Sequence, residues 1–97
     1  MLNRTQTLSC LRERRAYLAE AFGVEGLALF GSFARDTLTP QSDIDVLVRF
    51  DGPATSKRYF GLQFYLEDLL GRPVDLVTEK ALRPELRPYV EQDAIRV

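Results

Sequence analysis

The sequence has 97 residues, of which 45% are hydrophobic and 28% are charged, and we expect one small soluble domain over residues 1–97. Thirteen Lys and Arg against fourteen Asp and Glu give a net charge of −1, which excludes the overall basic charge of a general nucleic-acid-binding protein and leaves only a local basic patch open. Histidine is absent, so imidazole bases, imidazole metal ligands and Ser-His or Cys-His triads are excluded. Any chemistry must rest on carboxylates, hydroxyls and cations.

Cysteine usage and hydropathy indicate a reducing, cytoplasmic location. Cys10 is the single cysteine, cannot close an intrachain bridge and is expected to be a packed free thiol. No stretch approaches the ~18 apolar residues of a membrane span. Charges also occupy the N-terminal region where a signal peptide would be hydrophobic. We therefore expect no membrane association.

The first predicted element is a helix over about residues 7–22. Apolar residues recur along it at helical spacing: Leu8, Leu11, Leu18 and Phe22. Thr5 or Thr7 is the expected N-cap, and Gly23 is the expected C-terminal stop.

A short buried strand is predicted next, at residues 27–30. This continuous apolar run is too short for a helix and ends at Gly31, a turn signal. Ser32 can then cap a short helix over residues 32–37, and the turn chemistry of residues 37–42 surrounds Pro40.

A βαβ unit follows, beginning with a second strand over residues 44–50 that stops at residues 51–53. The next helix runs from Ser56 to Gly71, with one face marked by Tyr59, Leu62, Leu66 and Leu69. Residues 74–77 supply a third strand, which should lie parallel to the second. The strand at residues 27–30 most simply runs antiparallel to the second strand, which would place Gly31 beside its start.

Prolines organise the tail of the chain. Pro84 and Pro88 favour a turn over residues 84–87 and a short helix over residues 88–93, because proline suits the first turn of a helix and breaks its interior.

Two aspartates stand where the second strand begins. Asp is depleted in strands, and like charges about 4 Å apart repel by roughly 4 kcal/mol at an effective dielectric near 20. Alternation places Asp43 and Asp45 on one face, with Ile44, Val46 and Val48 on the other. Without imidazole or clustered sulfur, hard oxygen ligands favour Mg²⁺ or Mn²⁺, and Mg²⁺ usually adds substrate phosphates to one or two carboxylates. A metal-bound nucleotide is the predicted ligand.

The Gly31-Ser32 pair and Asp75 extend this site. Glycine lets the backbone approach a ligand, and Ser32 stands at a predicted helix N-terminus that attracts phosphate. Asp75 is a third carboxylate, suited to a second metal or to the proton of an attacking hydroxyl. This layout is typical of nucleotidyl transfer.

Each feature has a simpler interpretation when taken alone. A Gly-Ser pair usually makes a turn, and Asp75 could be a hydrogen-bond acceptor at a strand end. Arg35 fits a solvated helix position, and Asp36 fits a turn. The combination of these residues favours the functional interpretation.

The spacing Gly31-Ser32, ten residues, Asp43-Ile44-Asp45 resembles the motif of the minimal nucleotidyltransferases in the polymerase-β-like superfamily. The likeness continues through Ala34-Arg35, Ser42, the strand at residues 74–77 and the tail segment LRPELRPYV. It implies an α/β fold with a small mixed sheet of three or four strands flanked by helices. Asp36 stands where the family commonly has Gly, and Asp tolerates left-handed backbone better than most residues.

The resemblance also implies roles for individual residues. Nucleotide binding would fall to Gly31, Ser32, Arg35 and Ser42, and metal binding and catalysis to Asp43, Asp45 and Asp75. Members of this family typically act as antitoxins of HEPN-domain ribonuclease toxins, and some transfer AMP from ATP to a toxin tyrosine. The resemblance therefore implies an adenylyltransferase antitoxin that uses Mg²⁺ and ATP and forms a hetero-oligomer with its toxin.

Two other functions stay open at this point. One is nucleotidyl transfer to a small-molecule hydroxyl, such as that of an aminoglycoside, for which a second substrate-binding domain or a dimer would be needed. The other is a catalytically silent antitoxin that acts by binding. The intact set of aspartates favours an enzyme over the silent antitoxin.

Overall fold

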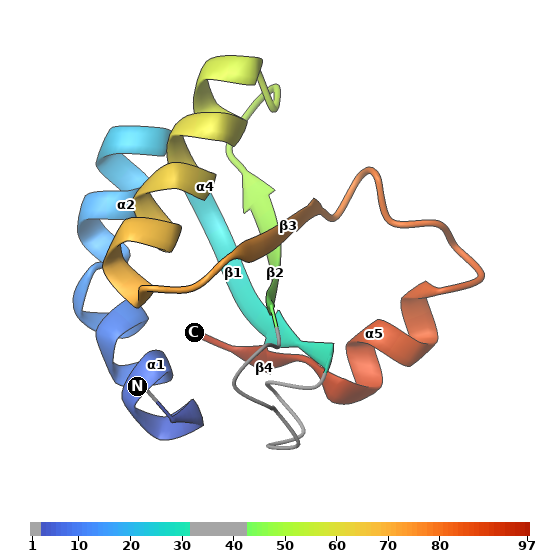
Figure 1. The fold of residues 1–97 in the computed structure, drawn as a ribbon. Helices are drawn as coiled ribbons and strands as arrows, with labels where there is room; N and C mark the ends of the chain where they lie inside the picture. Colours follow the sequence, from blue (N-terminus) through green and yellow to red (C-terminus); the bar gives the residue numbers. More distant parts are fainter. Residues whose placement is uncertain (1–2, 32–42) are drawn as a thin grey trace.

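The computed structural model describes residues 3–31 and 43–97, and a mixed sheet lies at its centre (Figure 1). The strands of the sheet are β1 (Val24–Phe30), β2 (Ile44–Phe50), β3 (Val74–Thr78) and β4 (Ile95–Arg96). Their order is β3-β2-β1-β4; β2 is parallel to β3, and β1 is antiparallel to both β2 and β4. The predicted strands and their relative directions are confirmed.

The N-terminal helical region differs from the prediction of one helix over residues 7–22. It consists of α1 (Arg4–Glu13) and α2 (Arg15–Phe22), separated at Arg14. The Arg14 N–H donates to the carbonyl of Leu11 at 3.1 Å, and its backbone has φ −96° and ψ 0°. This tighter three-residue turn interrupts the helix. Leucine periodicity alone could not reveal it, because the apolar spacing continues on both sides.

The N-cap prediction of Thr5 or Thr7 is wrong. Asn3 caps α1: its side chain accepts from the Gln6 N–H at 2.8 Å, and the Gln6 side chain accepts from the Asn3 N–H at 3.1 Å. This reciprocal pair is a capping box, which satisfies two otherwise unpaired donors. Thr7 is instead buried within α1. The predicted stop at Gly23 is confirmed by its left-handed backbone, with φ +72°.

Helix α4 (Ser56–Leu70) connects β2 to β3 and matches the predicted boundaries. The Thr55 side chain caps its start by accepting from the Arg58 N–H at 3.2 Å, and Gly71 ends it with φ +69°. Leu62, Leu66 and Leu70 form its buried stripe.

Helices α1, α2 and α4 lie together on one side of the sheet (Figure 1), and the hydrophobic core fills the space between them and the strands. Alternate strand residues enter this core, among them Leu27 and Leu29 of β1 and Val46 and Val48 of β2. Cys10 is a half-buried free thiol packed against the core, as predicted. The remaining, alternate residues of each strand lie on the opposite face of the sheet.

The tail forms α5 (Arg87–Asp93) and then β4. The predicted short helix is confirmed within one residue, with a proline in its first turn. Strand β4 had no sequence signal of its own because it spans only two residues. Its pairing with Ala28 and Leu29 covers part of the β1 edge. Within residues 3–31 and 43–97, no helix is long and apolar enough to cross a membrane.

Candidate active site

Asp45 and Asp75 are direct neighbours across the parallel strands β2 and β3. Residues in register on adjacent strands share a face, with a strand spacing of about 4.8 Å. Asp43 directly precedes β2, where the Ile44 N–H donates to the Pro73 carbonyl at 3.0 Å. Asp43 and Asp75 are exposed and Asp45 is half-buried. The predicted carboxylates therefore gather at one end of the sheet.

Gly31 lies against Asp45. It directly follows β1, and the last residue of that strand, Phe30, pairs with Asp45. A Cβ atom built on Gly31 would lie 2.2 Å from Asp45 Oδ2 and 3.1 Å from its Cγ, and the Gly31 backbone has φ +72°. Only glycine fits both constraints without strain. The predicted meeting of the glycine turn and the carboxylates is therefore observed.

The opposite face of the same strand anchors this arrangement. Ile44, Val46 and Val48 are at most 1% exposed and pack in the core. Their burial fixes which face Asp45 occupies, because a one-residue slip would bury the carboxylate and expose the apolar residues. The carboxylate is thus held by a rigid element, which suits a catalytic group.

Hydrogen bonds to both neighbours of Asp75 fix the backbone on each side of it in β3, an edge strand of the sheet. The Val74 N–H donates to Glu67 Oε2 at 2.9 Å, and the Val74 carbonyl accepts from Gln63 Nε2 at 3.0 Å. The Tyr59 hydroxyl donates to the Leu76 carbonyl. Residues 59, 63 and 67 follow at four-residue intervals and so form one stripe of α4. This polar stripe, not anticipated from the sequence, covers the outer edge of β3 on both sides of Asp75.

The donor set fits a hard divalent cation that also binds substrate. In the part of the chain that the structure describes, no group of three or more His, Cys, Asp or Glu side chains is gathered closely enough to hold a metal alone. Mg²⁺ usually retains waters and takes one or two carboxylates plus substrate phosphates. The contact of Gly31 with the Asp45 carboxylate places the glycine turn directly beside these oxygen donors.

Several predicted nucleotide contacts lie outside the described residues: Ser32, Arg35 and Ser42. The predicted helix at residues 32–37, the turn at residues 37–42 and Asp36 lie outside them as well.

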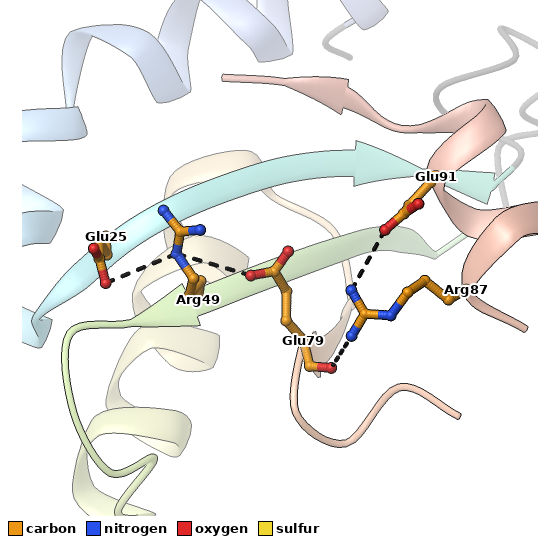
Figure 2. Close-up of polar contacts among 5 residues, drawn as sticks. All are labelled: Glu25, Arg49, Glu79, Arg87 and Glu91. Carbon is orange, nitrogen blue, oxygen red and sulfur yellow. Dashed lines mark hydrogen bonds and ion pairs between the residues drawn. The ribbon is translucent and has the colours of Figure 1, made fainter. Parts of the chain in front are cut away.

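A cavity of about 230 Å³ lies farther along the carboxylate face. Leu47 and Arg49 of β2 line it together with Ala28 of β1. Glu79, directly after β3, and Glu91 of α5 also line it, and Figure 2 shows these two side chains with Arg49. Strand alternation from Asp45 could have identified Leu47 and Arg49. Glu91 could not be placed there from the sequence, because it belongs to α5 in the tail.

Ion pairs connect the walls of this cavity (Figure 2). Arg49 Nε lies 3.7 Å from Glu25 Oε2 and 3.8 Å from Glu79 Oε2. Arg87 donates to the Glu79 carbonyl at 3.1 Å and lies 3.4 Å from Glu91 Oε1. Exposed pairs of this kind contribute only about 0–1 kcal/mol each. Their main effect is to hold the tail segment beside β2.

Comparison with known proteins places the chain in a family. The family model of the nucleotidyltransferase domain matches residues 11–97. Protein adenylyltransferase MntA of Thermococcus cleftensis is 34% identical over 97 residues, covering 100% of this chain and 98% of the relative. A solved structure described as a "putative minimal nucleotidyltransferase" has a TM-score of 0.83 and 36% identity, and the match covers 99% of this chain and 97% of that one.

A more distant structural match comes from a complex described as the tri-AMPylated Shewanella oneidensis HEPN toxin with MNT antitoxin. It has a TM-score of 0.65 at 20% identity, covering 93% of this chain and 70% of that one, and it shows the fold alone. The glycine turn and paired aspartates thus occur in the mixed sheet of a minimal nucleotidyltransferase, and the chain belongs to the nucleotidyltransferase domain family.

Proposed function

We propose that this protein is an adenylyltransferase antitoxin that transfers AMP from ATP to a tyrosine hydroxyl of a HEPN-domain toxin. The observation that carries the proposal is the convergence of Gly31, Asp45 and Asp75 at one end of the sheet. Two named relatives support the choice of substrate: MntA is called a protein adenylyltransferase, and the Shewanella oneidensis complex joins an AMPylated HEPN toxin to an MNT antitoxin.

Asp43, Asp45 and Asp75 are the residues that would hold Mg²⁺, with Mn²⁺ as the alternative cation. When bound, the cation neutralises charge on the transferred and departing phosphoryl groups. Phosphates held at the Gly31 turn would lie beside the Asp45 carboxylate that Gly31 contacts, and the motif adds Ser32, Arg35 and Ser42 as their partners. The nucleotide and the carboxylates would thus share one site.

In the proposed reaction one bond to phosphorus forms while another breaks, and a side chain of this chain accepts the released proton. The phenolic oxygen of the acceptor forms a bond to the α-phosphorus, while the bond from that phosphorus to the bridging oxygen of pyrophosphate breaks. The phenolic proton passes to the Asp75 carboxylate and then to water. Asp75 suits this task because its flanking residues are held by α4 and its own side chain is exposed.

The proposal extends to the setting of the protein. Residues 1–97 act as one domain, in the cytoplasm, in a hetero-oligomer with the toxin, without direct binding of nucleic acid or membrane. Neutralisation by simple masking of the toxin is the competing function, and the experiment is chosen to separate the two.

The test is incubation of the purified protein and its HEPN partner with Mg²⁺ and α-labelled ATP. We expect label on a tyrosine of the toxin and loss of ribonuclease activity. The Asp43→Asn, Asp45→Asn double variant is the control and should bind the toxin without labelling it. Full neutralisation by this double variant would favour masking over chemistry.

A further inference from the structure

We propose that the cavity on the carboxylate face receives the tyrosine side chain of the acceptor polypeptide; this inference rests on the proposed function and assigns its second substrate. The cavity has a floor of Gly26, Ala28 and Leu47 and a rim that includes Arg49, Glu79 and Glu91. It is called the acceptor cavity below.

The position of the acceptor cavity relative to the carboxylates carries the argument. Along β2, Asp45, Leu47 and Arg49 share one face at intervals of two residues, or about 6.7 Å per step. Gly31 lies at the other end, because β1 runs antiparallel with Phe30 beside Asp45 and Gly26 beside Arg49. Asp45, and Asp75 in register with it, therefore stand between Gly31 and the acceptor cavity.

Phosphoryl transfer places the attacking and leaving oxygens roughly in line, on opposite sides of the phosphorus. If the departing pyrophosphate is held at the glycine turn, the hydroxyl must approach from the far side of the carboxylates. The acceptor cavity occupies that side of the same face. The direction of attack thus assigns it to the acceptor rather than to the phosphates.

The size and chemistry of the acceptor cavity agree with this assignment. Its volume of about 230 Å³ is below the 300–1,000 Å³ that is usual for whole small-molecule ligands, so it suits a single side chain. The charged residues of its lining balance, with Arg49 and Arg96 against Glu79 and Glu91. A balanced lining does not attract a triphosphate, whereas a small apolar floor accepts a neutral phenol ring. A guanidinium at the rim can also lie on an aromatic face.

The walls of the acceptor cavity are held in place before any ligand binds. Glu79 continues the pairing of β3 with β2, its N–H donating to the Val48 carbonyl at 3.0 Å. Arg87 donates to the Glu79 carbonyl and forms an ion pair with Glu91 of α5, so it contacts both residues (Figure 2). A pre-organised wall lowers the entropic cost of binding a side chain.

Gly26→Leu is the variant that tests occupancy. A Cβ atom at Gly26 would lie 3.6 Å from Arg49 Cβ and 3.7 Å from Arg49 Nε, which is ordinary contact, and no positive φ opposes a side chain there. The added isobutyl group would fill the acceptor cavity. Gly52→Leu is the matched control: its Cβ would lie 3.6 Å from Arg58 Nη1, and Gly52 does not line the cavity.

The experiment uses N-acetyl-tyrosinamide as the probe, titrated into the full chain saturated with Mg²⁺ and AMP-PNP and followed by amide NMR. We expect the probe to shift the amide signals of Gly26, Ala28 and Leu47. Gly26→Leu should lower the affinity for the probe at least about tenfold, or about 1.4 kcal/mol, and Gly52→Leu should leave it unchanged. Calorimetry should show the same AMP-PNP affinity for all proteins.

Three results would overturn the inference. If Gly26→Leu lowers the affinity for AMP-PNP as much as it lowers the affinity for the probe, the cavity holds the nucleoside. If the probe shifts none of these amides, the cavity is not an acceptor site. The proposed function is judged separately. If Gly26→Leu leaves AMP transfer to the toxin unaffected, the enzymatic function stands and the acceptor role of the cavity is refuted. If the probe binds in the cavity but no transfer occurs, the acceptor role stands and the enzymatic function is refuted.

Discussion

The Asp45 carboxylate occupies the space that a side chain on Gly31 would need, because a Cβ at residue 31 would lie 2.2 Å from Asp45 Oδ2. Residue 31 must also hold φ +72°, a conformation that costs other residues about 1–2 kcal/mol. Two separate constraints, one of backbone and one of contact, therefore require glycine beside the carboxylates.

Gly31→Ala should weaken the binding of Mg²⁺ and ATP more than it weakens the fold. Its methyl group would displace the Asp45 carboxylate, so we expect at least about a tenfold loss of affinity, or about 1.4 kcal/mol. Gly71→Ala is the matched control, since Gly71 has φ +69° but a Cβ added there would meet no atom within 4 Å. Urea unfolding should show a stability loss for both variants, larger for Gly31→Ala because of its added contact with Asp45, and calorimetry should show a binding loss only for Gly31→Ala. Equal affinities would contradict a role for the Gly31 contact in the site.

The Asp43→Asn, Asp45→Asn double variant should keep its fold and lose transfer. Neutralising both side chains relieves the repulsion between like charges at the start of β2, so the unfolding temperature of the apo protein should be unchanged or slightly higher. The cation loses its anchors, and AMP transfer to the toxin should fall below detection. Asp51→Asn is a control, because Asp51 is an exposed residue beyond the other end of β2. Transfer at the normal rate by the double variant would refute the assigned site.

Mg²⁺ and ATP should bind cooperatively. The described carboxylates do not form a closed metal site by themselves, so the phosphates must supply part of the ligand set. By linkage, each ligand should tighten the other by the same factor. Titration of ATP with and without Mg²⁺, and of Mg²⁺ with and without ATP, measures both factors. Identical ATP affinities in the two conditions would count against a shared metal–phosphate site.

Glu67→Leu should destabilise β3 and impair catalysis through Asp75. The Val74 N–H would lose its acceptor in a part-buried position, which costs about 1–3 kcal/mol. Glu67→Gln retains a carbonyl oxygen that can accept and should restore most of the stability. Because the proposed reaction brings Asp75, and not Glu67, against the acceptor, we expect the kcat of the folded fraction to fall. A variant with lowered stability but normal kcat in its folded fraction would show that Glu67 is only structural.

Local sequence patterns determined much of this protein. The apolar run before Gly31, the alternation from Ile44 and the leucine stripe of α4 each specify an element through the contacts of near neighbours. The helix between the second and third predicted strands implied that these strands are parallel, and this predicted that Asp43 and Asp75 would lie at similar ends. In the structure it is Asp45 that lies in register with Asp75.

Only the tertiary structure decided how distant segments meet. The direct register of Asp45 with Asp75, the polar stripe of α4 along β3 and the glutamates around the acceptor cavity all join residues from separate elements. Periodicity reports which face of an element is apolar, but it carries no information on which polar side chain reaches another strand. Such contacts depend on the packing of the whole core, which sets the height and rotation of each helix against the sheet.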